Sequence, residues 1–192
     1  MTLERKIVGS LEVNRYILAL PEGRVEIDPG DGAPEAEKID YVLLTHGHFD
    51  HILGVARQKE QGSKVLISEA DAGMFESSRT SLCPPDAVLT PVKPDGFLEA
   101  GTLRLCGAEF QVIPTPGHTP GSVSLYLPSE SMLFSGDTLF KHGYGRTDFP
   151  GGSMMQLIAS LRRLFELPDE LIVYPGHGES GRLIDIKKGY LR

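Results

Sequence analysis

Four side chains of the types that commonly bind metal ions lie within six consecutive residues of this chain. They are His46, His48, Asp50 and His51, and Gly47 allows a tight backbone turn between the first two. A single histidine is more often a surface or hydrogen-bonded structural residue, and Asp50 alone would suit the cap of a helix that begins near His51. That explanation leaves three histidines without a role, so we interpret the segment as part of a metal site.

Three further candidate ligands occur later in the sequence, each after a short apolar run. They are His118, Asp137 and His177, and the segment 46–51 follows a similar apolar run. Short apolar runs of this kind are typical of buried β-strands. Because side chains placed just past strand ends can converge at one edge of a sheet, we expect these ligands to lie together.

The types of these side chains indicate which metal they would bind. Imidazole and carboxylate ligands without a thiolate favour zinc, with iron or manganese as alternatives. Five histidines and two aspartates are more than one tetrahedral ion can use. Two ions that share a carboxylate would use all of them, and such a pair, roughly 3.5–4 Å apart, can activate a water and polarise a carbonyl or phosphoryl oxygen. The residues therefore predict a two-metal hydrolase.

The pattern between the candidate ligands predicts a protein that mixes strands with helices, with sheets inside and helices packed outside them. A serine at position 153 is expected to cap the longest helix, whose apolar residues recur at a spacing of three and four. The expected strands are 13–20, 24–27, 41–44, 65–67, 102–105, 109–113, 122–127, 132–134 and 171–174, and the expected helices are 52–60, 70–77 and 153–165.

The chain of 192 residues suits one domain built from two fused βα halves. Residues 78–96 contain four prolines and show no clear periodicity, so we predict a long loop that links the halves. Long ordered loops in compact domains are also often lids or binding elements, and that alternative stays open.

Composition and charge limit the classes of partner. The formal net charge of −7 disfavours a sequence-independent nucleic-acid binder, which needs a basic face. The first ten residues lack the apolar segment of a signal peptide, and the longest apolar runs are too short to span a bilayer. The two cysteines, Cys83 and Cys106, do not make a disulfide framework, although a single bridge stays open. We therefore expect a cytoplasmic protein without a membrane or nucleic-acid partner.

The order and spacing of the candidate ligands resemble a known signature. Residues 45–51 (THGHFDH), followed by His118, Asp137 and His177, are similar to the metallo-β-lactamase superfamily, and the similarity includes residues 27–30. The resemblance covers nearly the whole chain. It implies an α/β protein with an αββα sandwich, in which two mixed sheets lie between outer helices and the metals lie at one edge.

The resemblance also implies a role for each candidate ligand. Asp137 would bridge two ions, and Asp50 would act both as a ligand and as a proton acceptor in catalysis. His142, the remaining histidine, receives no ligand role. The implied ligands of the first ion are His46, His48 and His118, and those of the second are Asp50, His51 and His177.

Within the superfamily, residues 135–140 and 145–151 resemble the hydroxyacylglutathione hydrolases, or glyoxalase II enzymes, and are closer to the short bacterial form. This similarity implies hydrolysis of small-molecule thioesters such as S-D-lactoylglutathione. Arg146 lies near the position of a cationic substrate contact in that family, with a structural ion pair as the alternative. Tyr144, in the same loop, would contact the substrate or simply pack the loop. Full-length members have an extra helical region that helps to hold glutathione, whereas this sequence ends soon after His177.

Other functions on the same fold stay open. Persulfide dioxygenases share the signature but hold a single iron with two histidines and one aspartate, here His46, His118 and Asp137. Relatives that process RNA cleave phosphodiesters. The usual zinc β-lactamases have cysteine at the position of Asp137, and flavodiiron proteins usually have glutamate at that of His48, which disfavours both.

Overall fold

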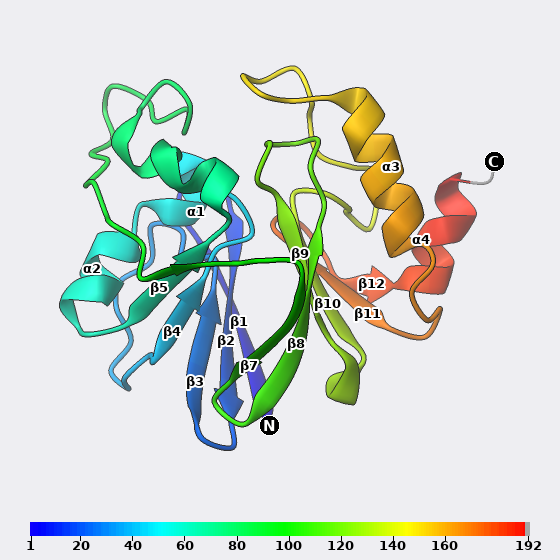
Figure 1. Ribbon diagram of the computed structural model, residues 1–192, viewed down its shortest axis with the longest axis horizontal. Helices are drawn as coiled ribbons and strands as arrows, with labels where there is room; N and C mark the ends of the chain where they lie inside the picture. Colours follow the sequence, from blue (N-terminus) through cyan, green and yellow to red (C-terminus); the bar gives the residue numbers. More distant parts are fainter. Residues whose placement is uncertain (191–192) are drawn as a thin grey trace.

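Two six-stranded β-sheets pack face to face in the computed structural model, which describes residues 1–190 (Figure 1). The first sheet has the order β1-β2-β3-β4-β5-β6, antiparallel from β1 to β3 and parallel from β3 to β6. The second has the order β12-β11-β10-β9-β8-β7, antiparallel except between β10 and β11. The strands are β1 (Thr2–Val8), β2 (Val13–Leu20), β3 (Gly23–Ile27), β4 (Tyr41–Leu43), β5 (Lys64–Ile67), β6 (Gly96–Phe97), β7 (Gly101–Leu105), β8 (Ala108–Pro114), β9 (Val123–Leu127), β10 (Met132–Gly136), β11 (Ile172–Pro175) and β12 (Gly181–Arg182).

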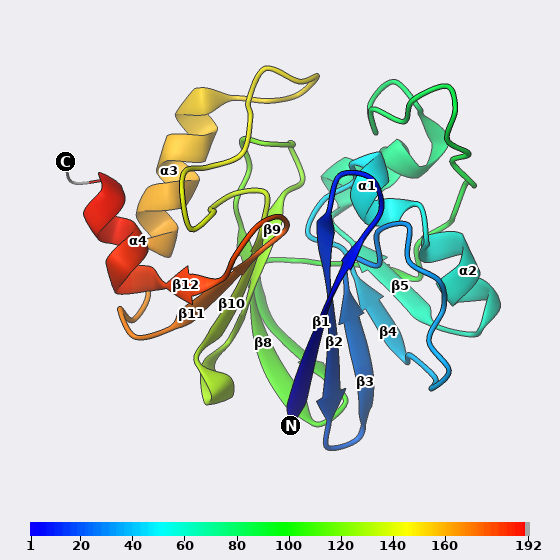
Figure 2. The same ribbon diagram turned by 180° about the vertical axis from the view of Figure 1, so that it is seen from behind.

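Helices cover the outer face of each sheet, as Figures 1 and 2 show from opposite sides. Apolar side chains from α1, α2 and η1 pack on the first sheet, and those from α3 and α4 pack on the second. The predicted αββα sandwich of mixed sheets and outer helices is therefore confirmed. The helices are α1 (Phe49–Ile52), α2 (Val55–Glu60), the 3-10 helices η1 (Glu69–Glu76) and η2 (Pro128–Glu130), α3 (Met154–Leu164) and α4 (Leu183–Tyr190).

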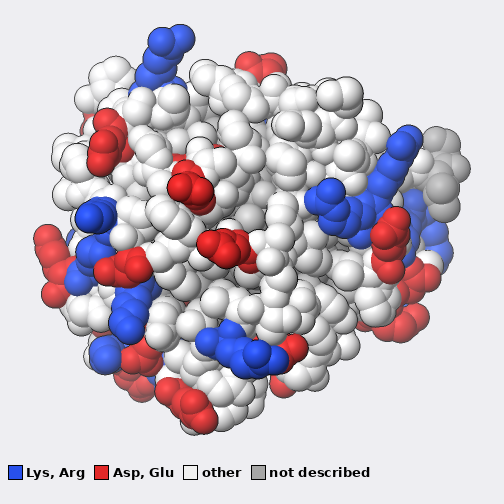
Figure 3. All heavy atoms as spheres, in the orientation of Figure 1, with Lys and Arg blue, Asp and Glu red and all other residues white. Residues whose placement is uncertain are grey.

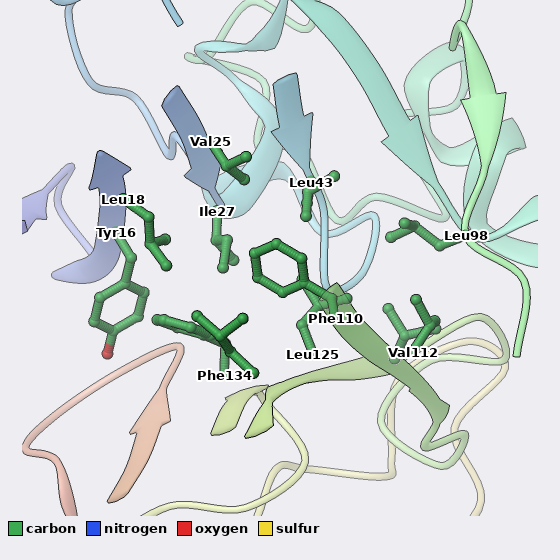
Figure 4. Close-up of a cluster of buried hydrophobic side chains, with 12 residues drawn as sticks. Tyr16, Leu18, Val25, Ile27, Leu43, Leu98, Phe110, Val112, Leu125 and Phe134 are labelled. Atoms are coloured by element: carbon green, nitrogen blue, oxygen red, sulfur yellow. The ribbon is translucent and has the colours of Figure 1, made fainter. Parts of the chain in front are cut away.

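The main core lies between the two sheets, where side chains from both sheets point toward one another (Figure 4). Strand β2 sends Tyr16 and Leu18 into this core and Ile17 to the outer face, as the period of two in a strand requires. Strand β4 is apolar throughout because Leu43 faces the core between the sheets while Val42 faces the outer layer. Burial of each such side chain contributes roughly 1.5–3 kcal/mol. Packing between the two sheets thus fixes the positions of the strand ends from which the loops at their edge begin.

The predicted helix 52–60 is wrong as one element, because α1 and α2 are separate helices. The backbone N–H of Gly54 donates to the carbonyl of Gly30 at 2.5 Å, so the loop after β3 packs into the break. A Cβ atom at Gly54 would come within 2.8 Å of that carbonyl oxygen. The predicted helix 70–77 is a 3-10 helix, whereas the cap at Ser153 is confirmed by the bond that its side chain accepts from the N–H of Gln156.

Several short or exposed elements have no counterpart in the sequence prediction. Strand β1 pairs with β2 along its whole length, from Thr2 opposite Ala19 to Val8 opposite Val13, but its residues are mostly exposed and polar. Strands β6 and β12 have two residues each, and α4 follows the last predicted strand. These elements lack the apolar runs on which the prediction depended.

The predicted linker, about residues 78–96, lies within the first half of the molecule. Residues 77–95 form turns and loop, and β6 then pairs with β5 of the first sheet. The chain crosses to the second sheet through residues 98–100. Both cysteines carry free thiols, and no helix among residues 1–190 is long and apolar enough to cross a membrane.

Candidate metal centre

The loops that follow four strands bring the seven predicted ligands together. Segment 46–51 lies after β4 and continues into α1, and the other three ligands follow β8, β10 and β11. Three groups of side chains each have potential ligand atoms within 4.8 Å of one another. The groups are His46, His48 and His118; His46, His51 and Asp137; and Asp50, His51 and His177.

The first group is a cluster of three buried imidazoles. Nδ1 of His48 lies 2.8 Å from Nε2 of His118, and the centroid of the His46 ring lies 4.8 Å from that of His48 and 4.9 Å from that of His118. All three side chains are almost fully buried. Neutral imidazoles offer one lone pair each, so this cluster can supply three nitrogen ligands to one cation.

The second group combines a carboxylate with two imidazoles. Oδ2 of Asp50 lies 3.3 Å from Nε2 of His177 and 3.6 Å from Nε2 of His51. The three side chains therefore point to a common position beside the first group, and they supply one oxygen and two nitrogen atoms.

Asp137 lies between the two groups and reaches both. Its Oδ2 is 3.5 Å from Nε2 of His118 in the first group and 3.6 Å from Nε2 of His177 in the second. Its Oδ1 is 3.5 Å from Nε2 of His51. This is the position that a carboxylate shared by two cations would need.

Unpaired polar atoms test whether these residues fit a metal. Within residues 1–190, Nε2 of His46, Nε2 of His51 and Oδ1 of Asp137 are buried and have no hydrogen-bond partner. Leaving such an atom unpaired costs about 1–3 kcal/mol, and here the atoms face one another. A divalent cation would satisfy them together, and an N/O donor set without thiolate suits zinc, iron or manganese. The donor set therefore fits a metal centre.

Hydrogen bonds to the outer nitrogens of the rings fix the orientation of three of the imidazoles. Nδ1 of His51 lies 2.9 Å from Oδ2 of Asp28, Nδ1 of His118 lies 2.7 Å from the carbonyl of Arg146, and Nδ1 of His177 lies 2.9 Å from the carbonyl of Leu11. Such partners leave Nε2 free to bind a metal and raise its basicity.

Asp28 is a buried functional residue that the sequence prediction missed. Its carboxylate accepts hydrogen bonds from the backbone N–H and the hydroxyl of Thr45 at 2.8 and 2.7 Å, in addition to its contact with His51. It thereby joins the end of β3 to the start of the ligand segment. The signal was present, because Asp28 directly follows a strand, as Asp137 does.

Asp71, in η1, is a second buried carboxylate outside the prediction. It accepts hydrogen bonds from the backbone N–H of Gly47, the hydroxyl of Thr119 and the N–H of Gly121. It therefore ties the loop that holds His46 and His48 to the loop that holds His118. No feature of its own neighbourhood in the sequence distinguishes Asp71 from a surface residue of a short helix.

Comparison with known proteins identifies the family. Residues 16–177 match the Metallo-beta-lactamase superfamily. The chain belongs to the metallo-beta-lactamase superfamily. It is 40% identical over 171 residues to the hydroxyacylglutathione hydrolase GloC of Haemophilus influenzae, covering 79% of this chain and 78% of that protein.

Two solved structures are similar to this chain over nearly its full length. The BLEG-1 B3 metallo-beta-lactamase has a TM-score of 0.86 and 33% identity, covering 97% of both chains. The protein TTHA1623, solved in a di-iron-bound form, has a TM-score of 0.85 and 36% identity, covering 97% of this chain and 98% of that one. This superfamily member is therefore a metal-dependent hydrolase, and its neighbours leave the identity of the metal open.

Two glycines of this superfamily member are required by close contacts at the centre. A Cβ atom at Gly176, directly before His177, would overlap Oδ1 of Asp137 and press on the ring of His51. A Cβ atom at Gly145 would overlap the carbonyl oxygen of Asp137. Glycine at these two positions thus reflects how tightly the backbone approaches Asp137.

Burial and neighbouring charges divide the histidines of the centre into two kinds. Burial, together with the other imidazoles, lowers the pKa of His46 well below its usual value and that of His48 to about 3. Burial would also lower the pKa of His51, but the carboxylates of Asp50, Asp28 and Asp137 outweigh it and raise the pKa to about 10. The carboxylate-rich half of the centre therefore retains a positive charge, which a metal ion can supply instead of a proton.

Loading the metal-free protein with zinc at pH 7.5 is expected to release about one to two protons per protein. The protons come from His51 and from His177, whose pKa the nearby Asp50 and Asp137 raise against the effect of burial. Because a proton competes with the metal at these rings, the affinity should increase as the pH rises toward 10. Titration calorimetry in PIPES and in HEPES measures the release, since these two buffers bind zinc weakly and differ in their heat of ionisation. Equal heats in both buffers would contradict the prediction.

A cavity of about 540 Å³ opens over the metal centre. The predicted substrate-binding residues Tyr144 and Arg146 both line it, and so does Asp50. His142 is exposed and belongs to none of the ligand groups. The lining of the cavity also contains apolar side chains that the sequence prediction did not name. They are Leu11, Phe49, Leu82, Phe140 and Phe149.

Proposed function

We propose that this metal-dependent hydrolase is a binuclear enzyme that cleaves thioesters, of the hydroxyacylglutathione hydrolase type. The observation that carries the proposal is the position of Asp137 between two ligand groups on the floor of a largely apolar cavity. The similarity to GloC supports the choice of thioesters among the substrates of the superfamily. The more general function, metal-dependent hydrolysis, follows from membership of the superfamily.

The proposed metals are two zinc ions, with iron or manganese as alternatives. When bound, they would activate a water and polarise the carbonyl oxygen of the thioester. Asp137 would be shared between them. His46, His48 and His118 would hold the first ion, and Asp50, His51 and His177 would hold the second.

Asp50 is proposed to orient the attacking water and accept its proton. Burial alone would raise the pKa of this carboxyl group, but His51 and His177 outweigh burial and lower the pKa to about 2. Asp50 therefore remains ionised at neutral pH and offers a hydrogen-bond acceptor within the cavity. A carboxylate in this place can hold the water in line with the carbonyl carbon.

The walls of the cavity suit the organic part of a thioester. Phe140, Phe149 and Leu82 present apolar surface around the centre, and Leu11 extends over it from the turn between β1 and β2. Such surface excludes water around the reacting carbonyl and strengthens the electrostatic interactions there. A thioester is less strongly hydrated than a phosphodiester, so this cavity favours the former.

Two alternative functions are distinguishable by experiment. A dioxygenase acting on persulfides would need a single iron, held by His46, His118 and Asp137. An RNA-processing phosphodiesterase would need a basic surface, whereas basic and acidic side chains are interspersed on the face shown in Figure 3. The similarity to a B3 metallo-beta-lactamase adds a lactam to the substrates worth testing.

The deciding experiment combines metal analysis of the purified protein with a small substrate panel. The panel contains S-D-lactoylglutathione, a simple ester, a β-lactam and glutathione persulfide, each supplied to protein loaded with zinc, iron or manganese. We expect two metal ions per chain and fastest turnover of the thioester. One iron per chain with oxygen consumption on the persulfide would instead establish the dioxygenase, and turnover of the lactam alone would establish a lactamase.

A further inference from the structure

Apart from the proposed metal ligands, the described lining of the cavity over the metal centre offers a substrate one cationic side chain. Among residues 1–190, Arg146 is the single lysine or arginine in its lining. An adjoining cavity of about 370 Å³ shares Leu11, Phe49 and Asp50 with it, and that lining contains Asp31 and Asp86 but no lysine or arginine. A substrate carboxylate that lies away from the metal centre therefore depends on Arg146 for a charge partner.

Asp148 already occupies the guanidinium of Arg146. Nε of Arg146 donates to one carboxylate oxygen of Asp148 at 2.9 Å, and Nη2 donates to the other at 2.6 Å. The guanidinium also lies over the ring of Phe149, with its Cζ atom 4.3 Å from the ring centroid. The two-point hydrogen bond and the stacking together hold the guanidinium flat at the edge of the cavity.

The position of Arg146 is also tied to the metal centre. Its carbonyl oxygen lies 2.7 Å from Nδ1 of His118, so the backbone of this loop is fixed relative to the ligands. The side chains of Arg146 and Asp148 are both more than half exposed, and an exposed ion pair of this kind is weak. A substrate carboxylate can therefore displace Asp148, but it must compete with it and stay close to its negative charge.

We propose that Asp148 is a specificity-determining residue. It pairs with Arg146, the one lysine or arginine in the cavity lining among residues 1–190, and it makes the site favour thioesters with an uncharged thiol arm over those with a carboxylate. This inference rests on the proposed thioesterase function and names the substrate class of the same site. Glutathione carries two carboxylates, so its thioesters would bind less tightly than neutral thioesters with the same acyl group.

The kinetic test uses two thioesters of nearly equal size and shape. S-D-lactoyl-3-mercaptopropanoate and S-D-lactoyl-3-mercaptopropanamide differ only in the carboxylate and the carboxamide. The ratio of their kcat/KM values, acid over amide, should be below one in the wild type. Asp148→Asn should raise this ratio about twofold to fivefold by lowering KM for the acid. The double variant Arg146→Met/Asp148→Asn should lose that gain.

A binding measurement makes the inference independent of turnover. The thioethers 3-(butylthio)propanoate and 3-(butylthio)propanamide cannot be hydrolysed, and their dissociation constants for the metal-loaded protein give the same ratio. If the wild type cleaves no thioester, the proposed function fails, while this binding ratio still decides the role of Asp148. We expect Asp148→Asn to strengthen binding of the propanoate relative to the propanamide by the same factor.

Asp185→Asn is the matched control. Asp185 is also an exposed aspartate in ion pairs, but its partners, Arg182 and Lys188, do not line either cavity, whereas Arg146, the partner of Asp148, does. Its replacement should leave both ratios at the wild-type value. Ratios that stay unchanged in Asp148→Asn, or a wild type that already prefers the carboxylate, would overturn the inference.

Discussion

Replacing Asp137 with alanine is expected to abolish hydrolysis and to lower the metal content of the protein at the same time. The carboxylate is the only side chain among residues 1–190 whose two oxygens contact His118 of one ligand group and both His51 and His177 of the other. Loss of a residue that merely orients a ligand costs about 10–100-fold in metal affinity or activity. Loss of a shared ligand should exceed the upper end of that range, or more than about a hundredfold.

The measurement pairs metal analysis with kcat/KM for S-D-lactoylglutathione on the same protein samples. Circular dichroism of the metal-free proteins shows whether the variant is folded, so that loss of the site is separated from loss of the fold. Asp185→Asn, which changes an exposed aspartate on α4, serves as the control and should retain metal and activity. An Asp137→Ala protein with full metal content and full thioesterase activity would refute the shared-ligand scheme.

The proposed ligands could be singled out from the sequence because each lies in a segment that follows a strand. A strand end fixes where the next few residues lie, and glycines such as Gly176 allow the backbone to approach the centre closely. The order His46, His118, Asp137 and His177 along the chain then follows the order in which β4, β8, β10 and β11 reach the same edge. Local patterns and the family resemblance thus agreed on one site.

Residues that support the ligands were harder to predict because their roles depend on distant contacts. Asp71 bonds to Gly47, Thr119 and Gly121, which lie 24 to 50 residues away from it. The break between α1 and α2 likewise arises from Gly30, which packs against Gly54. No periodicity within either segment encodes such a contact. Local sequence patterns reveal a strand and where it ends. The residues that support that end come from distant parts of the chain and are set by the tertiary fold.

A buried ion pair joins the neighbouring strands β2 and β3 of the first sheet. Arg15 on β2 and Glu26 on β3 form a close ion pair, and their side chains are 2% and 0% exposed. Arg15 also donates from Nη1 to the carbonyl of Ala33 at 2.6 Å. Asp28 lies in the segment between these two partners of Arg15, Glu26 and Ala33, and it contacts His51. Arg15 therefore braces the segment that orients a proposed ligand.

Arg15→Met is expected to destabilise the fold by about 3–4 kcal/mol near pH 9.5, because it leaves the carboxylate of Glu26 buried without its partner. Urea unfolding of the metal-free protein, with a chelator present, measures the effect without the contribution of metal binding. The double variant Arg15→Met/Glu26→Leu, which removes both charges, should recover much of the loss. A double variant as unstable as the single one would show that lost packing, and not the unpaired charge, is responsible.

The pH dependence of the free energy of unfolding further separates the effect of the unpaired Glu26 carboxylate from that of lost packing. Burial raises the pKa of Glu26 to about 7 even though Arg15 lowers it, and the usual value is 4.5. Between these two values the folded protein holds a proton that the unfolded chain has lost, so this residue makes stability fall as the pH rises. Without Arg15 the folded pKa rises further, and the fall continues above pH 7, where the wild type levels off. The difference between Arg15→Met and the wild type should therefore widen above pH 7, by up to about 1.4 kcal/mol per pH unit. Lost packing alone would give a difference that does not change with pH.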